Sequence, residues 1–148
     1  MKALRWIIAV AAMAFVMPAH AATTDPIQII YRMSGVTDNN AWATVLHCTN
    51  LSAVTETVRV VMRNGNGAIA GNADQFLPSF GSMTFTTRNT GNLFGGFNLV
   101  TGALQGTAVI ASTTTFIFCS AMIVDAALTP HGIALHLVRF SPMPGTTE

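Results

Sequence analysis

Histidine and methionine are the side chains in this sequence whose chemistry best suits a metal ion. His47, His131 and His136 supply imidazole nitrogens, and methionine thioethers are soft ligands that suit copper. His131 and His136 are five residues apart, so they could share one site. The sequence has no His-x-Met pair and no methionine cluster, and methionine also fills gaps in apolar cores. A carrier of copper or another metal is therefore an alternative hypothesis.

Hydrolysis would require a different set of side chains. Nucleophilic catalysis needs a nucleophile, a base and a group that orients the base, and glycoside hydrolysis needs two carboxyl groups. The sequence has no Gly-x-Ser-x-Gly turn, which presents the serine in one large class of hydrolases. Its few acidic residues fall mostly in expected turns or at strand ends. We expect no enzymatic activity and no cofactor, and a small secreted hydrolase is a further alternative.

The chain contains two cysteines, Cys48 and Cys119. An even number of cysteines in an exported protein favours a disulfide. The bridge would close a loop of about 70 residues, which stabilises a fold by on the order of 4 kcal/mol in the chain-entropy model. The alternative is two free, buried thiols.

The first 21 residues have the pattern of an export signal. Lys2 and Arg5 form a basic start, residues 6–17 are apolar without interruption, and Ala19 and Ala21 are the small residues that a signal peptidase requires. The apolar stretch is shorter than the roughly 20 residues that span a bilayer. We expect cleavage after Ala21, which leaves residues 22–148 as one domain in the periplasm or outside the cell.

The expected mature chain carries little charge. Without Lys2 and Arg5 it has five arginines and six acidic residues, which give a formal net charge of −1. This charged fraction is well below the roughly 25% of an average soluble domain. The sequence predicts no basic patch for nucleic acid, and its low charge does little to oppose association with another protein or with a second copy.

Short apolar or alternating runs, separated by Gly, Pro, Asn and Ser, predict an all-β domain of seven to eight strands. The regular spacing favours a two-sheet sandwich. Asn64-Gly65-Asn66-Gly67 predicts a hairpin turn, and Asn50-Leu51-Ser52, although it matches a glycosylation acceptor, is interpreted as a turn. The expected strands are 27–33, 41–48, 55–63, 68–70, 82–88, 100–112, 115–125 and 133–140.

Residues 98–124 contain no charge and are long enough to span a bilayer as a helix. They also contain two glycines, many hydroxyl side chains and many β-branched residues, and a hydroxyl-rich segment divides them. This composition favours two paired strands, so no integral membrane segment is expected after the signal is removed.

The order of three sequence features resembles small exported bacterial proteins of unassigned function. These features are a strand followed by Cys48-Thr49-Asn50, a hairpin, and a later strand with Phe118-Cys119-Ser120. The arrangement also resembles an immunoglobulin-like sandwich, in which a disulfide lies between the two sheets with an aromatic residue beside it. The resemblance implies that Trp42 could supply this aromatic residue. The Cys-Trp-Cys order of antibody domains is absent, since Trp42 precedes both cysteines.

The expected strand 115–125 is apolar on both faces, which is unusual for a sandwich with one wet face. Cys119 fixes the inward face, so Phe116, Phe118 and Met122 point outward. Either loops or another molecule should cover such a face. We therefore expect a non-enzymatic binding or assembly module. Its candidate interaction residues are Phe116, Phe118, Met122 and, from the Gly-rich loop, Phe94 and Phe97.

Overall fold

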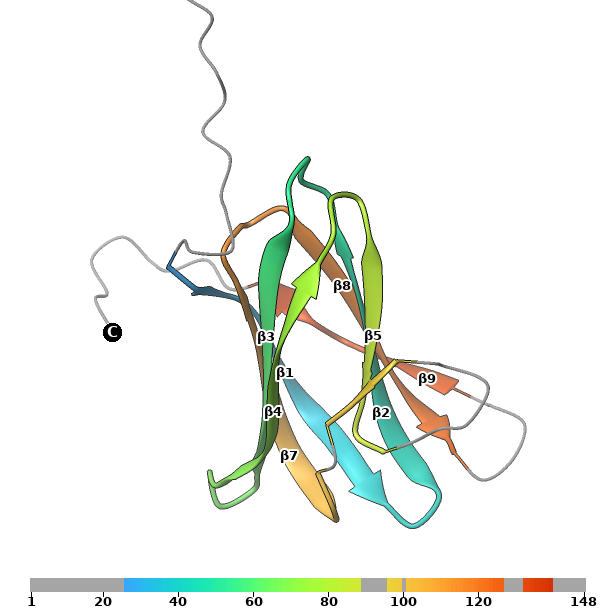
Figure 1. Ribbon diagram of the computed structural model, residues 1–148. Helices are drawn as coiled ribbons and strands as arrows, with labels where there is room; N and C mark the ends of the chain where they lie inside the picture. Colours follow the sequence, from blue (N-terminus) through green and yellow to red (C-terminus); the bar gives the residue numbers. More distant parts are fainter. Residues whose placement is uncertain (1–25, 89–95, 100, 127–131, 140–148) are drawn as a thin grey trace, which may run out of the picture.

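The computed structural model describes residues 26–88, 96–99, 101–126 and 132–139. Within these ranges the protein is all-β, which confirms the predicted class (Figure 1). None of these residues belongs to a helix long and apolar enough to cross a membrane. The strands are β1 (Gln28–Asn39), β2 (Trp42–Asn50), β3 (Glu56–Asn64), β4 (Ile69–Leu77), β5 (Ser82–Thr86), β6 (Phe97–Asn98), β7 (Leu104–Ser112), β8 (Ile117–Asp125), β9 (Gly132–Leu135) and β10 (Val138–Arg139).

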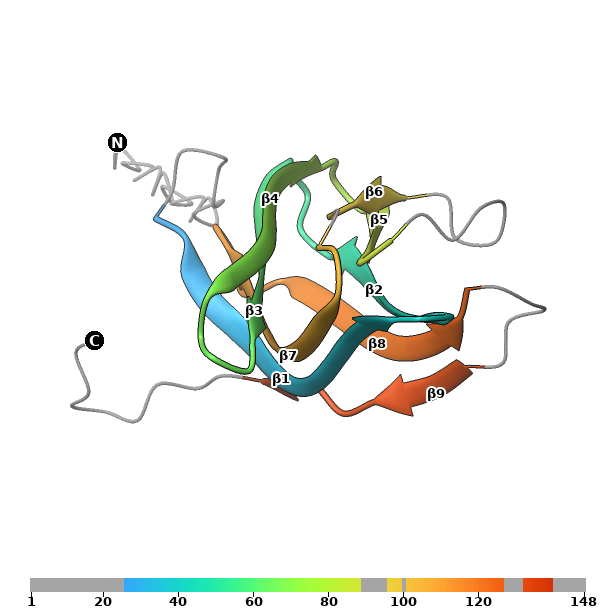
Figure 2. The ribbon, with the colours of Figure 1, turned by 90° about the horizontal axis from the view of Figure 1, so that it is seen from below.

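The strands form one continuous hydrogen-bonded sheet. Its main order is β4-β3-β7-β1-β2-β5-β6, with β8 paired to β2, β9 to β8 and β10 to β1. All pairs are antiparallel except β5 and β6. β1 and β2 share only two register pairs, Asp38 with Ala43 and Asn39 with Trp42, beside their hairpin. The sheet therefore curls at β1 and β2, and its two halves face each other (Figure 2).

The core lies between these two halves. One half contributes apolar side chains such as Val60 and Ile110, and the other contributes Leu46, Phe85 and Ile117, all in a single buried cluster. Because side chains alternate along a strand, each half directs one set inward. Burial of this apolar surface is the main favourable term in forming the fold.

The two ends of the sheet order come close together. A Cβ atom on Gly71 of β4 would lie 2.8 Å from the carbonyl oxygen of Leu99, which follows β6. It would lie 2.9 Å from Cγ2 of Thr101. Figure 2 shows β4 and β6 on the same side of the molecule. Gly71 therefore allows the curled sheet to close around its core, because no larger residue fits this approach.

Several predicted strand boundaries differ from the structure. The hairpin at 64–67 is confirmed, since the amide of Gly67 donates to the carbonyl of Asn64. The strand expected at 68–70 extends to Leu77, because pairing with β3 overrides the weak strand preference of glycine, asparagine and aspartate. The strand expected at 133–140 is divided into β9 and β10, which pair with β8 and β1 respectively.

The disulfide pair lies within one half of the sheet. Cys48 of β2 and Cys119 of β8 are directly opposite each other in adjacent antiparallel strands, with Cα atoms 4.1 Å apart. Their sulfur atoms lie at bonding distance, and both residues are buried in the core. The cysteine pairing agrees with the prediction, but the expected position between two facing sheets is wrong. Periodicity in the sequence shows which face of a strand a side chain lies on, but it does not show which other strand pairs with that strand.

Trp42 does not pack beside the disulfide, so the expectation drawn from the immunoglobulin-like resemblance is wrong. It lies at the β1–β2 hairpin and is 43% exposed. A tyrosine comes closer to the expected role, since the buried Tyr31 donates its hydroxyl to the carbonyl of Ile117, 3.1 Å away. Tyr31 is inward in phase with Met33, and the register shift between Ile29 and Tyr31 lets the adjacent Ile30 be buried in the core as well.

Candidate functional site

The candidate site is the face of β5, β2 and β8 that points away from the core, here called the outer face. The register places Phe118 beside Thr49, Ser120 beside His47 and Met122 beside Val45 on β2. Because directly opposite residues share a face, these side chains all project from the same side of the sheet. Cys119, between Phe118 and Ser120, points into the core, as predicted.

Four exposed apolar side chains, here called the aromatic patch, lie where β8 begins and in the turns after β2 and β4. Figure 1 shows these turns at the upper end of the sheet. Phe116 and Phe118 are 63% and 61% exposed, which agrees with their predicted outward orientation. Leu51 lies opposite Phe116 and donates its amide to the carbonyl of Phe116 at 2.8 Å. Phe80 follows in the next turn, where its amide donates to the carbonyl of Ser52 at 3.3 Å. The sequence prediction missed Leu51 and Phe80, because both lie in turns.

A fully buried asparagine holds the turns of the aromatic patch in place. The Nδ2 of Asn50 donates to the carbonyls of Val54, Leu77 and Pro78 at 2.7, 3.1 and 3.0 Å. Its Oδ1 accepts from the amide of Ser52 at 2.8 Å. This side-chain-to-backbone bond two residues ahead forms an Asx turn. The interpretation of 50–52 as a turn is confirmed.

Glu56 extends this buried network beneath the patch. Its two carboxylate oxygens accept from the hydroxyls of Ser52 at 2.9 Å and Thr113 at 2.6 Å, and the side chain is fully buried. The network therefore joins the segment after β2 to the segment after β7. It fixes the two turns that carry Leu51 and Phe116.

The backbone of Phe80 has an uncommon conformation for a bulky residue. Its φ is 56°, and the amide of Gly81 donates to the carbonyl of Pro78 across the turn at 2.9 Å. Glycine usually occupies this third turn position, because a side chain with positive φ approaches its own backbone. The hydrogen bond from Asn50 to the carbonyl of Pro78 helps to hold the turn. The turn therefore carries an exposed phenylalanine ring at a position where glycine would adopt the same φ with less strain.

A hollow lies next to the aromatic patch on the outer face. It has a volume of about 230 Å³ and is lined by Val45, His47, Thr84, Ser120 and Met122. The Nδ1 of His47 lies 3.0 Å from the hydroxyl of Thr84, and the imidazole is exposed. Met122, a predicted interaction residue, thus lines this hollow and is only partly exposed.

The lower end of the outer face is covered. Ala43, Val45 and Val124 are buried in a second, smaller apolar cluster, against which Met122 and Ala126 pack. Packing within the chain therefore covers the lower end of this face and leaves Phe116 and Phe118 exposed, so cover of these two rings by another molecule stays a prediction. Phe97 is partly covered, with its ring centre 6.4 Å from that of Phe85, while Phe94 is outside the described residues.

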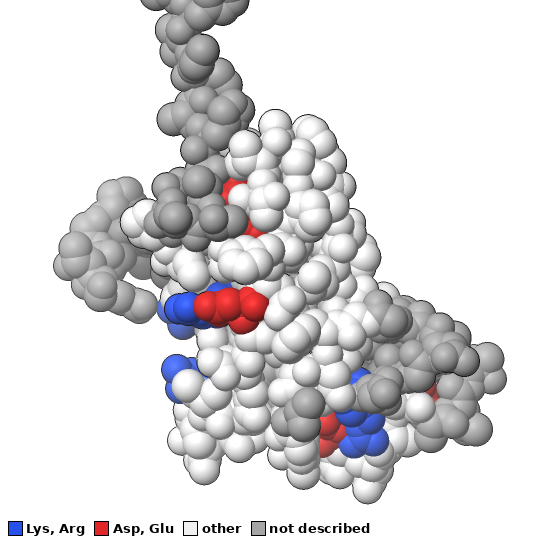
Figure 3. Space-filling model, in the orientation of Figure 1, with Lys and Arg blue, Asp and Glu red and all other residues white. Residues whose placement is uncertain are grey.

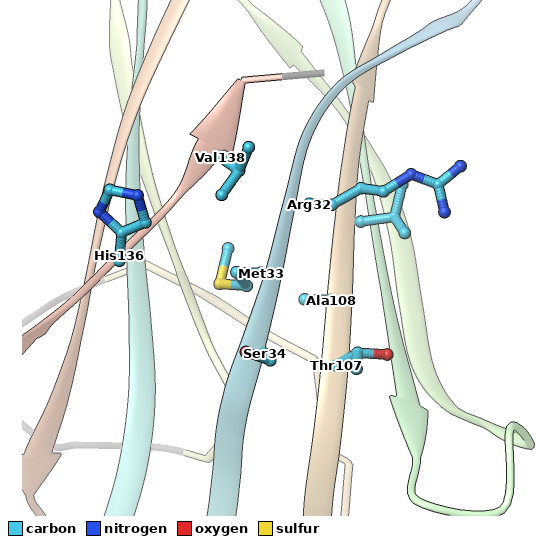
Figure 4. A pocket seen from close by; sticks show the side chains of 8 residues that line it. Arg32, Met33, Ser34, Thr107, Ala108, His136 and Val138 are labelled. Atoms are coloured by element: carbon cyan, nitrogen blue, oxygen red, sulfur yellow. The ribbon is translucent and has the colours of Figure 1, made fainter. Parts of the chain in front are cut away.

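The histidines of the metal hypothesis occupy different settings. His47 borders the hollow, and His136 borders a groove of about 420 Å³ between β1, β7 and the chain after β9. Figure 4 shows Arg32 directed away from His136 in this groove. In the described part of the chain, no three His, Cys, Asp or Glu residues are grouped as metal ligands would be. His131 lies outside that part.

The charged side chains on the face shown in Figure 3 occur mainly as ion pairs. Asp38 is buried, and it is paired with Arg88 and accepts from the hydroxyl of Thr101 at 3.0 Å. On β3 and β4, the Nε of Arg59 donates to Asp74 at 2.7 Å. This hydrogen bond lowers the pKa of the Asp74 carboxyl and raises that of Arg59. Two other arginines bond to backbone carbonyls instead, Arg63 to that of Gly67 and Arg139 to that of Thr115.

The ion pair between Arg59 and Asp74 predicts a small, pH-dependent effect on stability. Because the folded pKa of Asp74 is depressed, its contribution is present above the unfolded pKa of about 3.9 and is lost as the pH falls through the folded value. Both side chains are nearly half exposed, so Asp74→Asn should cost about 0.5 kcal/mol at neutral pH. Urea unfolding at several pH values measures this, and a difference that grows below pH ~3.9 would contradict it.

Comparisons were made with protein-family models, with curated proteins and with solved structures, and none of these matches the chain.

Proposed function

We propose that this chain is an exported, non-enzymatic binding or assembly module that contacts its partner through the outer face. The observation that carries the proposal is the exposure of Phe116 and Phe118 at β8, whose opposite face is buried in the core. Exposed aromatic side chains that adjoin one another are typical of surfaces that bind another macromolecule. Leu51 and Phe80 add two exposed apolar side chains, from segments whose backbone bonds to Phe116 and Ser52 respectively.

The buried polar network under the patch supports a binding role. Asn50 bonds to the backbone of both turns that carry Leu51 and Phe80, so its side chain holds the two turns together. Rigid presentation of a contact surface reduces the entropy lost on binding. The uncommon φ of Phe80 supports the same proposal, because backbone strain often occurs where a function requires it.

Export and architecture complete the proposal. The signal-like residues 1–21 and the Cys48–Cys119 pair both support a mature protein in the periplasm or outside the cell. The two halves of the sheet are joined along the β1–β2 contact by only two register pairs, and a common core lies between them. This arrangement supports an immunoglobulin-like two-sheet sandwich as the underlying architecture.

The test is site-specific photo-cross-linking of the exported protein in cells. A photoreactive phenylalanine analogue at Phe116 should give a cross-linked product of higher mass, because this ring is expected to face a partner. The matched control is the same analogue at Phe76 of β4, which is exposed to a similar extent. Equal cross-linking at the two positions, or none at Phe116, would refute the proposal.

A further inference from the structure

We propose that the partner of the outer face is a second copy of this chain, with Phe118 of each copy inserted into the hollow of the other. This inference rests on the function proposed above and names the partner. Phe118 projects from β8, and Ser120, which lines the hollow, is two residues further along the same face. A projecting ring and a cavity therefore lie side by side, about 7 Å apart.

The hollow has a suitable size and chemistry for a phenylalanine ring. Its volume is about 230 Å³, and an apolar protein cavity of about 150 Å³ already accepts benzene. Val45 and Met122 supply apolar contact, and thioethers contact aromatic rings favourably. The edge of the imidazole of His47, held by Thr84, would complete the lining.

Charge on the outer face does not oppose the meeting of two identical surfaces. The side chains that the register places there, from Phe118 to Met122 on β8 and from Ser82 to Thr86 on β5, include no Lys, Arg, Asp or Glu. The β2 residues between them, Thr49, His47 and Val45, likewise include no Lys, Arg, Asp or Glu. Like-charge repulsion, which often prevents self-association, is therefore absent from this part of the surface.

Twofold symmetry makes the contact closed and reciprocal. An axis that lies in the interface, crosses the strands and passes between Phe118 and the hollow brings each ring over the hollow of the other copy. Such an isologous interface uses the same surface twice and ends at two subunits. The β8 strands of the two copies then run in opposite directions.

The area available indicates a weak dimer. The four side chains of the aromatic patch are each 56% to 69% exposed, so together they offer on the order of 500 Å². With the hollow, each copy would bury an area near the lower end of the range for specific interfaces, which is about 600 Å² per partner. The extent of dimerisation should therefore be measured at protein concentrations from about 1 μM to about 1 mM.

The first experiment is analytical ultracentrifugation of the purified mature protein over this range. We expect a reversible increase from monomer to dimer mass. Phe118→Ala, which removes the ring, and Ser120→Trp, which fills the hollow, should each weaken dimerisation at least tenfold. Phe76→Ala on β4 should leave it unchanged, because Phe76 is equally exposed but lies away from the outer face. Thr84→Trp provides a second way to fill the hollow if Ser120→Trp does not fold.

An equimolar mixture of the two disruptive variants gives the sharpest test. Phe118→Ala retains an open hollow and Ser120→Trp retains the ring, so their heterodimer restores one of the two insertions. We expect the mixture to associate more tightly than either variant alone. A monomer at every concentration, or a dimer that neither variant weakens, would overturn this inference. Cross-linking of Phe116 to a different molecule in cells, with a monomeric pure protein, would overturn the inference and leave the proposed function standing.

Discussion

Replacing Cys48 and Cys119 together by alanine is expected to lower the free energy of unfolding by about 4 kcal/mol, the value for a loop of this length in the chain-entropy model. The two residues are 71 positions apart in the chain. They lie opposite each other near one end of the β2–β8 ladder, two register pairs before Asn50 and Ile117. This ladder faces the core on one side and the outer face on the other. Urea unfolding of the oxidised protein and of the double variant measures the difference.

Reduction of the disulfide supplies the control for this variant. With a strong reductant present, the unaltered protein should unfold at nearly the same urea concentration as the double variant, while the variant itself should not respond. Both sulfur atoms are buried, so reduction of the folded protein should be slow. A count of two free thiols in unfolded, unreduced protein would show that the bridge does not form.

Asn50→Ala is expected to cost about 3–5 kcal/mol, because several buried polar groups lose their partner in one substitution. The carbonyls of Leu77 and Pro78 and the amide of Ser52 all bond to this side chain. Alanine can replace none of these contacts and leaves a cavity as well. Equilibrium unfolding in urea checks the magnitude. Hydrogen exchange should show faster exchange in the segment after β2 and in the turn after β4 than in β3.

Two further variants separate this effect from a general intolerance of substitution. Asn72→Ala removes an exposed asparagine from β4 and should change stability by less than about 0.5 kcal/mol. Asn50→Asp keeps the size and the acceptor for Ser52 but loses the donor to the carbonyls, so it should also be strongly destabilising. A stable Asn50→Ala protein would mean that the turns under the aromatic patch are held by other contacts.

The Asn50 variant also connects stability to the proposed function. Leu51 and Phe80 lie in the two turns that this side chain joins. If the turns loosen, the aromatic patch loses its fixed geometry. Dimerisation of the Asn50→Ala variant should then be weaker even without urea, where the variant remains folded. Loss of stability with unchanged dimerisation would show that Phe118 and the hollow suffice for the contact.

The sequence alone determined the features that depend on local geometry. Alternation along 115–125 placed Cys119 inward and Phe118 outward, because successive side chains of a strand point to opposite faces. The Asn-Gly repeat at 64–67 located a hairpin, since a tight turn demands residues that accept positive φ. Short apolar or alternating runs between Gly, Pro, Asn and Ser indicated an all-β chain.

The tertiary structure decided which segments became neighbours. Sequence periodicity does not record that β8 pairs with β2, so it could not show that Cys48 and Cys119 lie on adjacent strands. It also could not distinguish Val45, which is buried, from Phe118, which is exposed, although both lie on the outer face. Leu51, Phe80 and the buried Asn50 lie in turns, where no period exists. These properties arise from contacts between distant segments, and only the folded chain brings those segments together.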